Sequence, residues 1–327
     1  MLSVSLAVLF GFAAQRGSLC AVSAIHVLIE HKTFGPFLSF LRCSAWVVLI
    51  SLPVWWLWPA ARVSEIYAFG LVGLAGAALF GAGAAISGGC AFGTLTRFAT
   101  GDTSFTLTVV GGTLGVWIEG ETFRTPTARP VGPTILARPG VAAIALLAAV
   151  GFWCVTGLMA RSDEAGSRRW ARLAPMVMGL TGGALYLIDG RGWAYTLDVG
   201  RLVSVPAPGE IAENVLLIIT AVTVAGAVAA AWSSGDFRPR LDIAVLPPRL
   251  GGGTLMGFGA ALVPGGNAVL ILHGIPAFSP HAVPDYLALC LGITVMLEIS
   301  GRLRTLARFP AMVHRSVHKA QTRRVEP

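Results

Sequence analysis

Long apolar runs, separated by short polar stretches, extend over most of the chain. Several of them reach or approach the length of about 20 residues that an α-helix needs to cross a bilayer. The pattern therefore predicts an all-α, polytopic membrane protein. The full spans are Phe37 to Trp58, Tyr67 to Ser87, Ser104 to Ile118, Gly140 to Ala160, Leu173 to Ile188, Glu213 to Trp232 and Val283 to Ser300.

Shorter apolar pieces, interrupted by Gly, Arg or Pro, lie between these spans. Because a helix of 10–13 residues covers only about 15–20 Å, such a piece cannot cross alone. It suits a broken helix or re-entrant loop that lines a cavity or packs inside protein. We therefore expect about nine spanning helices and several short broken or re-entrant ones. The pieces are Leu2 to Ala14 with Cys20 to Ile29, Cys90 to Ala99, Trp193 to Val203, and Thr254 to Val263 with Ala268 to Leu272.

One alternative for the first piece is a single long helix from Leu2 to Ile29. That helix would place the charge of Arg16 near its middle, which is costly in a membrane, so the broken helix is favoured. Between the helices we expect polar connectors. These are His31 to Pro36, Pro59 to Ile66, Gly120 to Pro139, Arg161 to Arg172, Pro206 to Glu210 and Gly235 to Leu250.

Composition excludes two other classes of protein. Only 12% of the 327 residues are charged and 55% are hydrophobic, whereas soluble domains carry about 25% charged residues. An ordinary soluble enzyme and a disordered chain are both excluded. The net charge of +8 is concentrated beside apolar spans, notably in the tail at 302–327. This distribution predicts a cytoplasmic C-terminus and a lipid environment, with no nucleic-acid partner.

Glycine spacing suggests an internal repeat. Gly11 and Gly81 lie 70 residues apart, and Gly183 and Gly257 lie 74 apart. Interrupted segments in matching positions of two halves are the sequence sign of a transporter site. We predict one transporter domain with pseudo-symmetric halves at about 1–120 and 140–301, followed by the basic tail.

Three interrupted segments carry the candidate chemistry. A polar run precedes the first cysteine, and Gly-Gly pairs precede the second cysteine and an asparagine. Adjacent glycines let a backbone turn and approach a ligand closely, and a helix that begins at Cys90 would direct free N–H groups at an anion. The candidate pathway residues are Gln15, Arg16, Gly17, Cys20, Gly88, Gly89, Cys90, Gly265, Gly266 and Asn267.

The remaining polar and sulfur-containing residues are expected to be structural. Five cysteines without a C-x-x-C predict neither a disulfide framework nor a metal site. Their spacing offers no close pair. Arg97 is expected to pair with Asp102, and His273 to be a core histidine with satisfied hydrogen bonds. For Arg16, pairing within a loop, capping of a helix and attraction of an anion remain open.

The motifs Gln15-Arg-Gly-Ser-Leu-Cys20-Ala, Gly88-Gly-Cys90-Ala-Phe-Gly-Thr-Leu95 and Pro264-Gly-Gly-Asn267 resemble the YeeE/YedE family of sulfur transporters. The resemblance covers nearly the whole chain. It implies a bacterial inner-membrane protein that takes up thiosulfate or a related anion, without catalysis or cofactor. It also implies inward-plunging loops in which the thiols of Cys20 and Cys90 pass the anion along by S–H···S contacts.

Gly266 stands where thiosulfate importers of this family carry a third cysteine. Three alternatives therefore stay open: a transporter of another sulfur or selenium species, a non-transporting accessory subunit, and a membrane thiol oxidoreductase. A small sulfur-carrier protein on the cytoplasmic side is a candidate partner.

Overall fold

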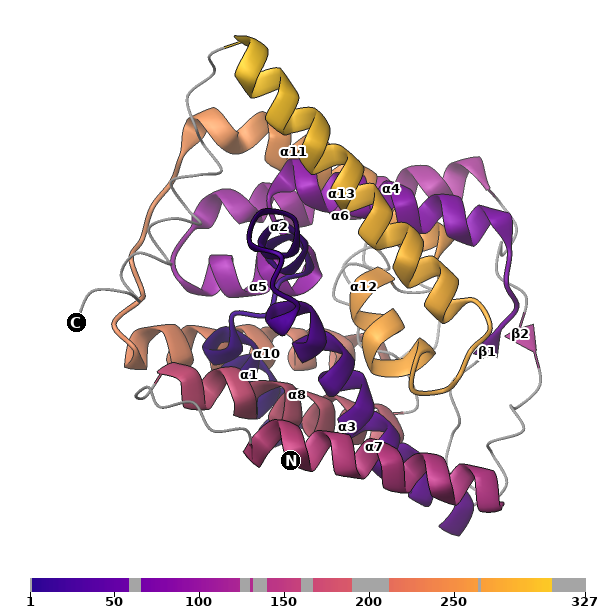
Figure 1. The fold of residues 1–327 in the computed structure, drawn as a ribbon. Helices are drawn as coiled ribbons and strands as arrows, with labels where there is room; N and C mark the ends of the chain where they lie inside the picture. The colour runs from indigo at the N-terminus through magenta and orange to yellow at the C-terminus, as the bar shows by residue number, and fades with distance from the viewer. Residues whose placement is uncertain are drawn as a thin grey trace.

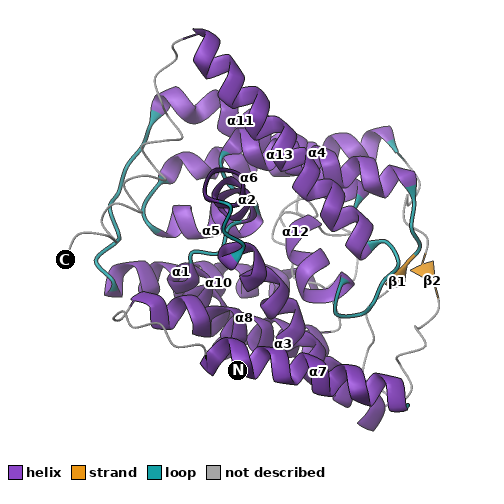
Figure 2. Ribbon diagram, viewed as in Figure 1, coloured by secondary structure: helices purple, strands orange, loops and turns teal. Residues whose placement is uncertain are grey.

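The computed structural model describes residues 2–58, 66–123, 130–131, 140–159, 167–189, 212–263 and 266–307. Nearly all of the described residues form helices, and Ile66–Tyr67 (β1) and Pro130–Val131 (β2) form one short antiparallel pair (Figure 2). The first helices are α1 (Leu2–Gly17), α2 (Ala21–His31), α3 (Gly35–Leu57), α4 (Leu71–Ser87), α5 (Ala91–Ala99), η1 (Thr103–Phe105) and α6 (Thr106–Thr122). They are followed by α7 (Val141–Met159), α8 (Ser167–Asp189), α10 (Ala212–Ser233), η3 (Ile243–Val245), α11 (Leu246–Leu262), α12 (Gly266–Val269), the π-helical η4 (Leu270–Gly274) and α13 (Ala282–Ala307).

The apolar helices support the prediction of an all-α, multi-pass membrane protein. Within the described residues, five segments are long and apolar enough to cross a membrane. Two of them are broken pairs, Leu2–His31 (α1 and α2) and Leu71–Ala99 (α4 and α5). Counting the bent pair Ile243–Leu262 and Gly266–Gly274 as one span gives six. The expected number of nine spans stays a prediction.

The helices form two groups with shorter segments between them (Figure 1). In one group α1 packs against α8 and α10, and α3 packs against α7 and α8. In the other group α4 packs against α11 and α13, and α6 packs against α11. The short helices α2, α5 and α12 lie between the groups, so that all three helix breaks reach the middle of the molecule.

The outer faces of several helices are apolar and exposed. Val141 and Phe152 on α7 are 88% and 73% exposed, and Leu287 and Leu291 on α13 are 60% and 61% exposed. A soluble protein would bury such side chains, whereas lipid tails solvate them. These faces therefore fit a bilayer environment.

Within the two groups, glycine allows helices to approach backbone to backbone. A Cβ added to Gly226 of α10 would lie 2.2 Å from the carbonyl oxygen of Val8, and one on Gly292 of α13 would lie 2.1 Å from that of Ala78. Small residues at such crossings are typical of membrane helices, where close packing replaces the hydrophobic effect.

Several expected boundaries are wrong by a few residues. The connector Arg161 to Arg172 ends earlier, because α8 begins at Ser167. The connector Gly235 to Leu250 also ends earlier, because α11 begins at Leu246 with prolines in its first turn, where a missing N–H costs nothing. The span expected from Tyr67 begins instead at Leu71, after Gly70. The predicted piece Trp193 to Val203 lies outside the described residues.

Candidate functional site

The first helix break lies between α1 and α2. The helix ends at Gly17, Ser18 takes the left-handed conformation with φ 49°, and Cys20 is the extended N-cap of α2. Ser18 donates its N–H to the carbonyl oxygen of Gln15 at 3.2 Å. The polar run before Cys20 therefore ends one helix and starts the next, as expected for a broken helix.

The second break repeats this backbone between α4 and α5. Gly88 is left-handed with φ 76°, and Cys90 is the extended N-cap of α5. Gly88 and Gly89 close the end of α4 by donating their N–H groups to the carbonyl oxygens of Ala85 and Ala84. This is the glycine-dependent helix ending that a left-handed cap requires.

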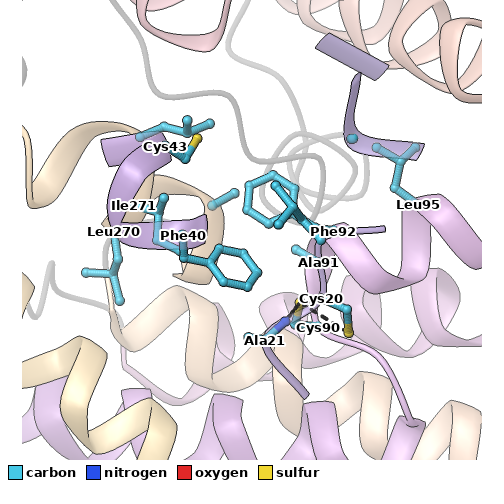
Figure 3. Packing of buried hydrophobic residues seen from close by; sticks show 14 of the residues in the cluster. Cys20, Ala21, Phe40, Cys43, Cys90, Ala91, Phe92, Leu95, Leu270 and Ile271 are labelled. Atoms are coloured by element: carbon cyan, nitrogen blue, oxygen red, sulfur yellow. Dashed lines mark hydrogen bonds between the residues drawn. The ribbon is translucent and has the colours of Figure 1, made fainter. Parts of the chain in front are cut away.

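The two breaks bring the thiols of Cys20 and Cys90 together (Figure 3). Their sulfur atoms are 3.9 Å apart, and Cys90 Sγ also accepts the N–H of Ala21 at 3.2 Å. Cys20 is 5% exposed and Cys90 is fully buried. The expectation that no cysteines form a close pair is wrong, because the fold joins two breaks 70 residues apart.

The thiol pair belongs to the same buried cluster as several aromatic rings, and it lies against a glycine of α5. Phe92, two residues after Cys90, contacts the rings of Phe10 and Phe40 at centroid distances of 6.2 Å. Cys20 Sγ lies against the backbone of α5, and a Cβ at Gly93 would be only 2.4 Å from it. The thiols are thus buried and tightly packed, and Gly93 is needed for their contact.

The third break, after α11, lacks a thiol. Gly266 is left-handed with φ 63°, and a Cβ there would lie 2.8 Å from the Phe80 ring. Asn267 is fully buried, and neither atom of its side-chain amide has a hydrogen-bond partner among the described residues. Gly265 lies outside the described residues. Since a buried polar group without a partner is costly, Asn267 is a candidate ligand-binding side chain.

The remaining predicted residues of the first break have structural contacts. The Arg16 guanidinium donates to Ser233 Oγ at 3.1 Å and lies over the rings of Phe12 and Trp170. Gly17 allows α8 to approach, because a Cβ there would lie 2.5 Å from Ala174 Cβ. Gln15 is buried, and its Oε1 has no hydrogen-bond partner in the described part of the chain.

Two expectations about polar side chains are wrong. Asp102 pairs with Arg240 at 3.1 Å rather than with Arg97. The loop after α10 forms backbone hydrogen bonds with residues 100–103, and these bonds place Arg240 beside Asp102. His273 is not a satisfied core histidine. It is buried against the Tyr186 ring at 4.1 Å, and neither ring nitrogen has a hydrogen-bond partner among the described residues.

Sequence reasoning missed Arg249. The expected connector Gly235 to Leu250 includes Arg249, but this residue lies in the first turn of α11 and is only 9% exposed. Its guanidinium stacks on Phe105, with Cζ 3.5 Å from the ring centroid. The signal that could have revealed it is Pro247-Pro248, because proline is favoured in the first turn of a helix. A helix start at Leu246 would have placed Arg249 inside the molecule.

Together, the fold and the buried breaks define a multi-pass α-helical membrane protein whose polar groups gather at interrupted helices. A model of the sulphur transport family matches residues 16–295, and the chain belongs to this family. The resemblance to YeeE/YedE proteins is thereby confirmed. A comparison with curated proteins gave no match. Membership indicates a transporter of sulfur compounds and agrees with the expectation of a non-enzyme.

Proposed function

We propose that the protein takes up thiosulfate or a closely related sulfur anion across the bacterial inner membrane. The observation that carries this proposal is the contact of two buried thiols, Cys20 and Cys90, at 3.9 Å between two helix breaks. Such a pair offers sulfur-directed contacts where a polar backbone reaches the middle of the molecule.

The chemistry of the thiol explains why weak contacts are suitable. Thiosulfate is a dianion with one soft, polarisable sulfur, and a neutral thiol is a weak donor. Two neighbouring thiols can therefore hold that sulfur in turn without trapping it. Sites that bind weakly and in sequence favour throughput, because the ion must also leave.

The arrangement of helices supports the expected repeat as part of this proposal. The carbonyl groups of Val8 and Ala78 each lie close to a glycine of another helix. These two residues are 70 positions apart, the same separation as between Gly11 and Gly81. Matching crossings on both sides of the thiol pair are what a transporter built from repeats would have. We further propose that the basic tail faces the cytoplasm, where a small sulfur-carrier protein could accept the cargo.

The test is uptake of radiolabelled thiosulfate into proteoliposomes that contain the full chain, with sulfate and selenite as competitors. Cys90→Ala and Cys90→Ser are expected to fold and to lose uptake, since serine offers a harder, more strongly hydrated hydroxyl. Cys43→Ala is the matched control, because Cys43 is equally buried but lies apart from the pair (Figure 3). Uptake by Cys90→Ala equal to that of the parent would rule out a role for the thiol.

The thiol contact also favours one second candidate, a membrane thiol oxidoreductase. Such an enzyme would oxidise the thiols of Cys20 and Cys90 to a disulfide and transfer two electrons and two protons to a quinone. Reduction of a soluble quinone by the purified, thiol-reduced protein would support this candidate. Uptake of intact thiosulfate without quinone reduction would exclude it.

A further inference from the structure

Two arginines converge on the backbone of the second break. The position that a Cβ of Gly88 would occupy lies 2.9 Å from Nη1 of Arg249 and 3.9 Å from Nη1 of Arg97. Both guanidinium groups also lie over the same ring, with their Cζ atoms 3.5 Å and 5.7 Å from the centroid of Phe105. Two cations from different helices therefore approach one point of the chain, two residues before Cys90.

No acidic side chain in the described part of the chain pairs with these cations. Neither Arg97 nor Arg249 has an ion pair there, and the buried Nε of Arg249 has no hydrogen-bond partner. The acid nearest in sequence to Arg97 is Asp102, and its carboxylate already accepts hydrogen bonds from Arg240 and Ser104. No carboxylate of the described residues thus lies at ion-pair distance from either guanidinium, and Asp102 and Asp242 attract Arg249 only from further away.

Burial makes this arrangement unfavourable without a ligand. Arg249 is only 9% exposed, and a buried charge is tolerated when it is paired and hydrogen-bonded. Its position in the first turn of α11 adds to the cost, because the amino end of a helix repels a cation. Phe105 compensates in part, since the face of an aromatic ring attracts a guanidinium. It supplies no acceptor for the N–H groups.

We propose that Arg97 and Arg249 form a binding site for the oxygen atoms of a divalent oxyanion, namely the sulfonate end of the transported sulfur anion. The site deepens the proposed function and rests on it for the identity of the cargo. Guanidinium groups suit such oxygens because they donate several hydrogen bonds in a fixed planar geometry. The site is placed beside Gly88, where a side chain would collide with Arg249, and the free N–H groups at the start of α5 face the same break.

This site divides the recognition of the cargo between two parts of the second break. The arginines hold the oxygen end beside Gly88, and the sulfur end is directed toward the thiols. Sulfate has the same charge and oxygen atoms but lacks the soft sulfur. It is therefore expected to bind at the arginines without being passed on, and to compete with thiosulfate for them.

The experiment measures binding of radiolabelled sulfate and thiosulfate to the purified full chain in detergent, and uptake into phosphatidylcholine vesicles. Arg249→Gln and Arg97→Gln are expected to weaken the binding of both anions by at least about tenfold, because each removes charge-assisted hydrogen bonds. Arg249→Lys should bind with intermediate affinity. Arg238→Gln, in the exposed loop after α10, is the matched control and should bind like the parent.

Separate readouts distinguish failure of this site from failure of the proposed function. Cys90→Ala should still bind sulfate, although it is expected to lose uptake. Sulfate binding that depends on Arg249 supports the site even if the parent takes up no thiosulfate. Equal sulfate affinity of the parent and Arg249→Gln overturns it, whether or not the parent transports. The outcome in which Arg249→Gln only lowers thermal stability would mean that the arginines merely neutralise the carboxyl end of α4.

The same ligand chemistry could come from a lipid phosphate. Adding phosphatidylglycerol to the vesicles distinguishes the two sources. Uptake with an unchanged KM supports a site for the soluble anion. The proposal would be overturned by two results together. Phosphatidylglycerol would raise the KM for thiosulfate in the parent but not in Arg249→Gln, and anionic lipid would abolish sulfate binding. The site would then belong to the lipid headgroup.

Discussion

The breaks at Cys20 and Cys90 share a backbone but differ in their charges. Each has a left-handed residue, an extended cysteine at the N-cap and a buried thiol. At the first break, Arg16 is engaged by Ser233 and by two aromatic rings. At the second, Arg97 and Arg249 converge on the glycine without an acidic partner. The same backbone arrangement thus supports two chemical environments: one guanidinium held by a hydroxyl and two rings at the first break, and two converging guanidinium groups at the second.

The largest effect in this comparison is expected for Gly93→Ala. The new methyl would lie 2.4 Å from Cys20 Sγ, so that the thiol must leave its contact with Cys90. Uptake should fall by at least about tenfold, although alanine is favoured over glycine in a helix by about 1 kcal/mol. The measurement is thiosulfate uptake together with oxidative cross-linking of Cys20 to Cys90.

Ser23→Ala is the control at the corresponding place after the first break, two residues into α2 as Gly93 is into α5. It should retain both uptake and cross-linking. A Gly93→Ala protein that cross-links and transports like the parent would show that the close approach of α5 to Cys20 is not needed.

A smaller effect is expected for Arg16→Gln, and of a different kind from that at Arg249. The hydrogen bond to Ser233 and the contacts with two rings each contribute about 0.5–1 kcal/mol. The variant should therefore unfold at a lower temperature. Its affinity for thiosulfate should change by less than about twofold, whereas loss of a binding contact would lower the affinity by about tenfold. Ser233→Ala, which removes only the hydrogen bond, should show a smaller loss of stability. A large rise in KM for Arg16→Gln would instead make the two breaks alike.

The smallest effect is expected for Ser18→Gly. A side chain in the left-handed conformation costs about 1 kcal/mol, and glycine relieves that cost but gives the unfolded chain more freedom. Stability should change by less than about 1 kcal/mol. Gly88→Ala at the matching position should be clearly destabilised, because its methyl would also lie 2.9 Å from Arg249. Thermal unfolding in detergent compares the two, and equal losses would contradict the difference in their surroundings.

Local sequence signals predicted the helices and their interruptions. Apolar length gave the spans, and the glycine pair before Cys90 marked a turn that only glycine adopts without strain. These features depend on neighbouring residues, so they are visible in the chain alone. The prediction of nine spans goes further than the five or six segments of the described residues.

Contacts between distant segments could not be predicted in the same way. Cys20 and Cys90 meet because α1 and α4 end at neighbouring places, which no local pattern encodes. Arg249 was missed because Pro-Pro and several glycines resemble a loop, and only packing against α4 and α6 makes that stretch a helix. The partner of Asp102 was wrong for the same reason, since Arg240 arrives from a loop 138 residues later.

The glycines that pack against carbonyl oxygens of neighbouring helices limit how the protein can move. Gly226, Gly257 and Gly292 each leave a gap to a neighbouring helix that even one methyl group would overfill. Helices that interlock so closely resist sliding and rotation against each other, as close-packed interiors transmit strain instead of yielding to it. We therefore expect each helix group to move as one rigid body. A route for the cargo would then open by displacement of the short helices between the two groups, α2, α5 and α12. Their movement would leave the packing within each helix group unchanged.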